Sequence, residues 1–364
     1  MKISRIYRLL CCLLLVGWFA TPMAHSQEPG AESQELRAES QEPTAESLLS
    51  DNARIYLVTC SPGEALYERF GHTAIMIIDP DRGIEDVYNY GIFDFNTSHF
   101  YWKFMRGETY YQLGKESARW FITAYTRGGR TVNLQELHLS TQARELFYRA
   151  LVENYKPENR VYLYNFVYDN CATRPLNLLL AVLDREAGVS GEESAITSTY
   201  QGAEGVTYRK FIQRYIPKGA WADLGINLLF GPKADEAMHG EQRLFLPEEV
   251  MNWVSEARYP DGTPLVEGEN IEPFEIERIP WYGTWYFGLV VLFVIVALIS
   301  YHDRRILKRT RWLDYVLYAV YGVLLVLVTF LTFFSIHPLV GYGSYLLIIP
   351  SVHLCARIIY RWRS

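Results

Sequence analysis

The sequence lacks the short motifs that many nucleotide- and metal-dependent proteins carry. It has no zinc-type CxxC pair, no P-loop and no GxGxxG, so neither nucleotide binding nor a structural metal is favoured. It also lacks an excess of positive charge, because the formal net charge of its 364 residues is -6. That balance gives no reason to expect a nucleic-acid partner. No convincing set of metal ligands stands out, and we expect no cofactor.

Cysteine is scarce, and most of it falls in apolar runs. Of the five cysteines, Cys11 and Cys12 lie in an N-terminal apolar run and Cys355 in a C-terminal one. Only Cys60 and Cys171 remain for the segment between. In an exported protein, two such cysteines either form one disulfide or stay as two free thiols.

The N-terminal residues have the pattern of a secretory signal. Basic residues precede an apolar run at 9–19, and small residues at 24–26 suit cleavage, so we assign 1–26 to a signal peptide. An uncleaved anchor is the alternative, but the run is short for a membrane span. Residues 27–50 contain the near-repeat "AESQELRAESQEPTAES", which has too few large apolar groups to fold alone. We expect a flexible acidic linker there.

Long apolar runs dominate the C-terminal part and predict three transmembrane helices, at 281–301, 313–335 and 339–360. The loop at 302–312 is strongly basic, whereas the segment between the last two spans is uncharged. The positive-inside rule therefore places the basic loop and the C-terminus in the cytoplasm. The domain before the first span is then exported, in agreement with the signal peptide.

Between these parts we expect one folded domain at 52–256, followed by a polar linker at 257–280. Alternating and β-branched runs predict strands, and apolar residues at helical spacing predict helices. "PDRG" at 80–83 predicts the turn of a hairpin. The expected strands are 54–60, 72–79, 86–95 and 162–169, and the expected helices are 140–156, 175–184, 208–216 and 247–257. The domain is therefore of the α+β class.

Cys171 lies where an aromatic, strand-like run turns into an apolar, helix-like one, in "VYLYNFVYDNCATRPLNLLL". A thiol at a helix start is favoured as thiolate by unpaired N–H groups and the helix dipole. A nucleophilic thiol needs a base, and His72 stands at the start of an expected strand, which would hold its ring rigidly. The backbone N–H of Cys171 is a candidate oxyanion donor.

A third group should orient the imidazole of His72. Asn89 and Asp94 on the following strand are candidates, with Asn89 slightly favoured. Asp169 and Asn170 either bind substrate or cap the helix. Arg174 either holds a substrate phosphate or carboxylate or pairs with Asp169.

Several stretches resemble a bacterial membrane-tethered family, the Lnb-type apolipoprotein N-acyltransferases. They are "LVTCSPGEALYERFGHTAIMI", "YNYGIFDF" and "PENRVYLYNFVYDNCATRPLNLLL", with "FGHTAI" and "DNCATR" the most specific parts. The likeness covers about residues 52–254. It implies a permuted papain-like thiol-enzyme domain, in which His precedes Cys, and the three predicted transmembrane helices match the family only in general layout.

The resemblance also implies a reaction and its partners. Cys171 would take an acyl chain from a phospholipid as a thioester and pass it to the α-amine of a diacylglyceryl lipoprotein, with His72 moving the protons. The protein would lie in the bacterial inner membrane with its catalytic domain in the periplasm. Aromatic residues are candidates for docking the acyl chain, although core packing is the alternative for each: Tyr110, Tyr111, Trp102 and Phe104.

Two other functions stay open at this stage. One is a membrane-anchored cysteine amidase or peptidase acting on cell-wall peptide, which needs no more than one anchor. The other is a non-enzymatic envelope module held by a Cys60–Cys171 disulfide. Cys60 is otherwise a second thiol in the same site.

Overall fold

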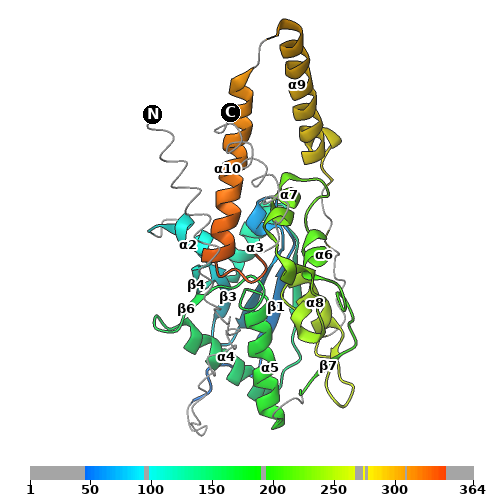
Figure 1. The fold of residues 1–364 in the computed structure, drawn as a ribbon. Coiled ribbons are helices and arrows are strands. Elements are labelled where there is room, and N and C mark those ends of the chain that lie inside the picture. The colour runs from blue at the N-terminus through cyan, green and yellow to red at the C-terminus, as the bar shows by residue number, and fades with distance from the viewer. Residues whose placement is uncertain are drawn as a thin grey trace. The chain divides into compact units, whose positions relative to one another are not determined.

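The structure is a computed structural model that describes residues 46–93, 98–189, 194–266, 274, 278–307 and 310–341. A six-stranded antiparallel sheet with strand order β5-β1-β2-β3-β4-β6 forms its centre (Figure 1). The strands are β1 (Arg54–Cys60), β2 (His72–Asp79), β3 (Ile84–Ile92), β4 (Tyr110–Ser117), β5 (Val132–Glu136) and β6 (Val161–Leu163).

The central strands are apolar on both faces because helices cover both sides of the sheet. Successive side chains point to opposite faces, so Ile55 and Ile75 belong to one buried cluster and Val58 and Ala74 to another. The ladder between β1 and β2 pairs Arg54 with Ile78 at one end and Cys60 with His72 at the other.

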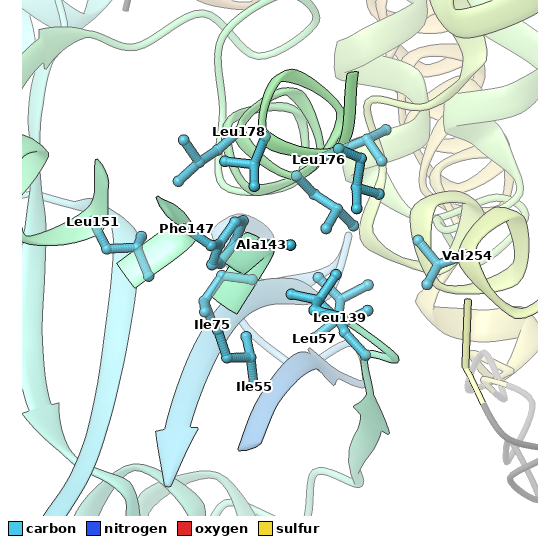
Figure 2. Close-up of a cluster of buried hydrophobic side chains, with 14 of the residues drawn as sticks. Ile55, Leu57, Ile75, Leu139, Ala143, Phe147, Leu151, Leu176, Leu178 and Val254 are labelled. Atoms are coloured by element: carbon cyan, nitrogen blue, oxygen red, sulfur yellow. The ribbon is translucent and has the colours of Figure 1, made fainter. Parts of the chain in front are cut away.

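The larger core lies between the sheet and two long helices, α4 (Thr141–Tyr155) and α5 (Thr173–Ala187). Figure 2 shows Ile55, Leu57 and Ile75 of the strands facing side chains of both helices, with Val254 beside them. The Ser140 hydroxyl caps α4 by accepting from the Ala143 N–H at 3.0 Å.

Helix α3 (Ala118–Arg127) covers the other face. Its Phe121 is 1% exposed and packs in the cluster that holds Val58, Cys60 and Ala74. On this face, a helix with aromatic side chains therefore lies over the ends of β1 and β2.

The chain after α5 adds a second apolar cluster built around Phe211, Met238 and Phe245, which also takes in Leu339. Its elements are β7 (Thr197–Ser198), α6 (Tyr208–Gln213), α7 (Trp221–Leu229), α8 (Pro247–Ser255) and β8 (Ala257–Arg258), together with four short 3-10 helices at Leu66–Glu68, Pro232–Asp235, Gly240–Arg243 and Trp281–Gly283. A short helix α2 (Phe100–Arg106) lies between β3 and β4.

Two described helices are long and apolar enough to cross a membrane. The most apolar 18 residues of α9 (Trp285–Ile306) have a mean hydropathy of 2.0, and those of α10 (Arg311–Phe334) of 2.4. At about 1.5 Å per residue both helices exceed the ~30 Å of a hydrocarbon core. Helix α9 runs into the segment expected as a basic loop. The third expected span at 339–360 lies almost wholly outside the described residues, as do the signal peptide and most of the acidic linker.

Most expected elements of the domain are present, including the hairpin at 80–83, so the α+β class is confirmed; the permuted papain-like fold stays a prediction. The strand expected at 162–169 is wrong beyond Leu163. Asn165 accepts hydrogen bonds from the N–H groups of Val167 and Tyr168 at 3.0 and 3.1 Å, and this side-chain turn ends the strand.

Candidate active site

His72 is held by a polar relay that crosses from β2 to β3 and β4. Its Nε2 lies 2.5 Å from Oδ1 of Asn89, and the Asn89 amide nitrogen lies 3.4 Å from Oε1 of Glu116. Because a carboxylate only accepts hydrogen bonds, the amide nitrogen faces Glu116 and the amide oxygen faces the ring. Nε2 therefore donates, and Nδ1 is left as the basic nitrogen.

Aromatic rings of α3 fix the plane of the imidazole. The ring of Tyr125 lies nearly parallel to that of His72, at an interplanar angle of 11° and a centroid distance of 6.1 Å. Phe121 approaches at 6.5 Å. These contacts restrict rotation of the ring out of the relay.

Cys171 lies two residues before α5, in the turn that leads into the helix. The Asn170 carbonyl accepts from the Arg174 N–H at 3.1 Å, which makes Asn170 the residue that begins the helical hydrogen bonding. The N–H groups of Thr73 and of Cys171 itself face the Cys171 sulfur and lower its pKa. Thr73 follows His72 directly, so the thiol lies beside the start of β2.

A local break in the sheet makes room for this thiol. The ladder between β2 and β3 runs only from the Ile75–Tyr88 pair to the Asp79–Ile84 pair. On the far side of β3, Tyr90 and Gly91 face a single residue of β4, which is a β-bulge. Gly91 has a φ of 92°, and a Cβ there would lie 3.6 Å from Cβ of Cys171.

Burial keeps both candidate groups neutral. It raises the pKa of the Cys171 thiol to about 11, although the two N–H groups and the charge of Arg130 act in the opposite direction. Burial also lowers the pKa of His72 to about 4, with the Asn89 hydrogen bond opposing the shift. Burial therefore outweighs the helix-dipole effect, which by itself would lower the pKa of the Cys171 thiol. The imidazole is therefore unprotonated at pH 7, as a general base must be, but a pKa of about 4 makes it a weaker base than one near 7.

No hydrogen bond joins His72 to Cys171 among the contacts of the described residues. The backbone brings the two residues near each other. Thr73, the residue after His72, directs its N–H at the Cys171 sulfur, beyond the point where the β2–β3 ladder ends. Catalytic hydrogen bonds are often loose in a free enzyme and tighten when substrate binds.

Cys60 is a free thiol and so is Cys171, so the disulfide alternative is not the state of this structure. Cys60 is 0% exposed and faces His72 across the β1–β2 ladder. Burial raises its pKa to about 12. Such a thiol is inert toward reagents in solution.

The three candidates for substrate binding have internal partners. Arg174 makes a two-pronged ion pair with Asp169, at 2.6 and 2.7 Å, and its guanidinium lies 3.6 Å from the ring centroid of Tyr162. Asn170 is 2% exposed. Its amide donates to the carbonyls of Phe166 and Phe245 and its oxygen accepts from Ala172 and Thr173. This geometry favours the capping and pairing alternatives. Asp94 lies outside the described residues.

Arg130 and Glu116 belong to the site although no sequence motif marks them. The Nε of Arg130 donates to the Ser61 carbonyl at 2.7 Å, and its guanidinium lies 4.4 Å from the Tyr125 ring centroid. Its side chain is only 10% exposed, and its positive charge lowers the pKa of both Cys171 and Cys60. Only the pairing of β5 beside β1 brings it here. For Glu116, the one signal in the sequence is its place in the alternating pattern of a strand.

The fold and site together define a membrane protein whose α+β domain gathers a cysteine, a histidine and an asparagine. Two family models match the chain, the Lnb N-terminal periplasmic domain over residues 40–201 and the Lnb transmembrane domain over residues 284–364. The chain therefore belongs to the Lnb family, and its α+β domain is periplasmic. The first match includes His72, Asn89 and Cys171. No curated protein and no solved structure matches the chain.

Proposed function

We propose that this protein is a lipoprotein N-acyltransferase. It moves an acyl chain from a phospholipid, through a thioester on Cys171, to the α-amine of a diacylglyceryl-cysteine at a lipoprotein N-terminus. The observation that carries the proposal is a pair of neighbouring contacts. Nε2 of His72 lies 2.5 Å from Oδ1 of Asn89, and the N–H of the next residue, Thr73, faces the Cys171 sulfur. Membership in a family with a periplasmic and a transmembrane domain supports the proposal, because it puts the domain that holds this thiol next to a membrane.

In the first step the thiol is acylated. The Cys171 sulfur attacks the ester carbonyl carbon while Nδ1 of His72 takes the thiol proton. The N–H groups of Thr73 and Cys171 are the nearest donors to the oxyanion that forms. The carbon–oxygen ester bond then breaks, the leaving oxygen takes the proton from Nδ1, and a lysophospholipid departs.

In the second step the acyl group leaves the thioester. The uncharged α-amine of the lipoprotein attacks the thioester carbonyl, and Nδ1 of His72 takes one amine proton. The carbon–sulfur bond breaks, and the proton passes from Nδ1 to the Cys171 sulfur, which restores the thiol. An amide is formed, and no redox partner is needed.

The positions of the helices support this assignment. Both substrates are lipids, so their ester and amine lie at a membrane surface. The positive-inside rule predicts that the basic residues after α9 lie in the cytoplasm, together with the C-terminus. The protein then lies in the inner membrane with Cys171 on the periplasmic side.

The test is complementation of a strain depleted of its own lipoprotein N-acyltransferase, with mass spectrometry of a lipoprotein N-terminus. Wild type and Cys60→Ala should restore the third acyl chain, because Cys60 is buried and not a nucleophile. Cys171→Ser and His72→Ala should leave a free amine while their protein levels match that of wild type.

Two results would count against the proposal. Normal acylation by Cys171→Ser and His72→Ala would show that these residues do not carry the reaction. A free amine with stably produced wild type would rule out N-acyl transfer and bring the amidase function forward.

A further inference from the structure

A row of aromatic rings connects α2 with the candidate nucleophile. In order from α2 its members are Phe100, Phe93, Tyr111 and Tyr164, called the aromatic row below. Successive ring centroids are 6.1, 5.0 and 4.4 Å apart. The row ends at the thiol, since a Cβ on Gly91 would lie 3.6 Å from Cβ of Cys171 and 3.9 Å from the Tyr164 ring.

The other end of the row lies against a membrane helix. The Trp102 ring of α2 is 5.1 Å from that of Phe330 in α10. Nε2 of His337, just after α10, donates to the Phe104 carbonyl at 2.8 Å. Phe330 is one turn, about 6 Å, before the last residue of α10. Helix α2 is therefore level with the last turn of α10. The topology predicted by the positive-inside rule puts that turn where the bilayer meets the periplasm.

The composition of α2 is that of a helix at a membrane surface. Tyr101, Trp102 and Phe104 are 75%, 50% and 47% exposed, an unusual display for a helix in water. Lys103 and Arg106 lie among them. Aromatic rings with basic side chains are enriched where hydrocarbon meets lipid headgroups.

Core packing accounts for only part of the row, since Tyr111 and Tyr164 pack at the margin of the larger core. Tyr88 and Tyr90 on the same sheet are core rings, each 1% exposed, whereas all four members of the row are only partly buried. Partly buried rings in contact with one another offer apolar surface that a lipid chain can cover.

We propose that the aromatic row is the acyl-chain surface of the enzyme. Helix α2 lies in the outer leaflet, and an acyl chain passes from the bilayer along Phe100, Phe93 and Tyr111 to reach the thiol beside Tyr164. This inference rests on the proposed function, because it requires an acyl ester to react at Cys171.

The test compares a long and a short acyl donor on the full-length protein in lipid nanodiscs. The probes are p-nitrophenyl hexadecanoate and p-nitrophenyl acetate, and intact mass with peptide mapping measures acylation of Cys171 in a single turnover. Phe93→Ala should lower the long-to-short rate ratio at least tenfold, with the acetate rate nearly unchanged. Phe93→Leu, which keeps apolar volume, should lie between. Trp120→Ala removes a 69% exposed ring outside the row and should leave the ratio unchanged.

The outcomes separate this inference from the proposed function. An equal loss with both probes, or no loss with either, overturns the acyl-chain surface and leaves thioester chemistry intact. If wild type is acylated by neither probe, the proposed function fails and the acyl-chain surface fails with it. If Phe93→Ala does not fold, Phe93→Leu and Tyr111→Leu decide by the same ratio.

The membrane position of α2 can be measured without any activity. Trp102→Cys and Asp81→Cys are labelled with a fluorophore, the second in the turn at the end of β2 remote from His72, and the parent chain gives the background. Lipids with a nitroxide near the headgroup should quench position 102 several-fold more than 81, and aqueous iodide should do the reverse. Equal quenching at both positions would place α2 in water and overturn the inference.

Discussion

The two ends of β2 carry a buried aspartate and a partly buried histidine, which differ in how fully their polar atoms are hydrogen-bonded. At one end Asp79 is 0% exposed and accepts from the Ser50 N–H and hydroxyl, each at 2.7 Å, and from the Arg82 N–H at 3.3 Å. At the other end His72 uses Nε2 on Asn89, and no contact of the described residues uses Nδ1. The β2–β3 ladder is closed beside Asp79 and open beside His72.

This difference separates a stabilising group from a reactive one. Burial alone raises the pKa of Asp79, but its hydrogen bonds outweigh burial and hold the pKa below the ordinary 3.8. Its charge is thus fully compensated. At the His72 end the compensation is partial. The basic Nδ1 of His72, the Cys171 thiol and the N–H groups of Thr73 and Cys171 have no ladder partner in β3. Incomplete satisfaction of buried polar groups is typical of functional sites.

The largest effect should come from breaking the relay at the open end. Asn89→Ala removes the acceptor that fixes the tautomer of His72, so N-acylation should fall on the order of 100-fold. Asp79→Asn should leave the rate per folded molecule unchanged but cost about 1–3 kcal/mol of stability. Acylation assays and thermal unfolding of the purified full-length variants measure both. Equal activity losses in the two variants would remove the distinction between the ends.

The two ends should also respond to acid in different pH ranges. The pKa of His72 falls from 6.5 when unfolded to about 4 when folded, so the unfolded chain binds more protons between these values. Stability should therefore drop as the pH falls from 6.5 to 4, by about 3 kcal/mol in total at ~1.4 kcal/mol per unit. The stability that Asp79 contributes is lost only below pH 3.8, as its folded pKa is approached.

Unfolding followed by tryptophan fluorescence at each pH measures this dependence. His72→Gln should flatten the curve between pH 6.5 and 4 and leave the drop below pH 3.8. An unchanged curve in that variant would mean that another group causes the loss.

The two thiols at the open end should differ in reactivity. Alkylation of Cys171 by iodoacetamide should be slow at pH 7 and rise about tenfold per pH unit toward its pKa of about 11. Cys60 is 0% exposed and should react only after unfolding. Peptide mapping of the alkylated protein distinguishes the two. A fast reaction of Cys171 at pH 7 would show a thiolate and contradict the neutral pair.

The smallest effect concerns Arg130, whose charge lowers the pKa of Cys171. Arg130→Met keeps much of the apolar stem and removes the charge, so the alkylation profile of Cys171 should shift to higher pH and the rate at a fixed pH should fall a few-fold. Arg54→Met, at the exposed start of β1 near the Asp79 end, is the matched control and should leave the profile in place. A shift of the same size in both variants would exclude a local effect of Arg130.

Local sequence predicted much of this fold. Strands β1 and β2 and helices α4, α5 and α8 follow from runs whose period matches their secondary structure. The error at 162–169 arose because an aromatic run outweighed the turn formed by Asn165. For the site, His72, Asn89 and Cys171 were selected by residue type and position at the ends of elements, and the structure brings all three to one end of β2.

Residue type alone did not separate Asn170 from a ligand-binding residue. An asparagine beside a cysteine suits either role, and only the carbonyls of Phe166 and Phe245, the latter remote in sequence, show that its amide is fully used. Arg174 and Asp169 are similar, since a cation and an anion five residues apart pair only if the backbone turns between them.

The sequence by itself determined the class of domain, the apolar helices and the chemical types available for a site, because these depend on local periodicity and composition. Only the tertiary structure decided that the positive charge of Arg130 lies near the Cys171 thiol, that Glu116 orients Asn89, and that aromatic rings extend from α2 to Cys171. Each of these depends on which strands pair and where a ladder opens, and pairing is set by the burial of the whole chain rather than by any segment of it.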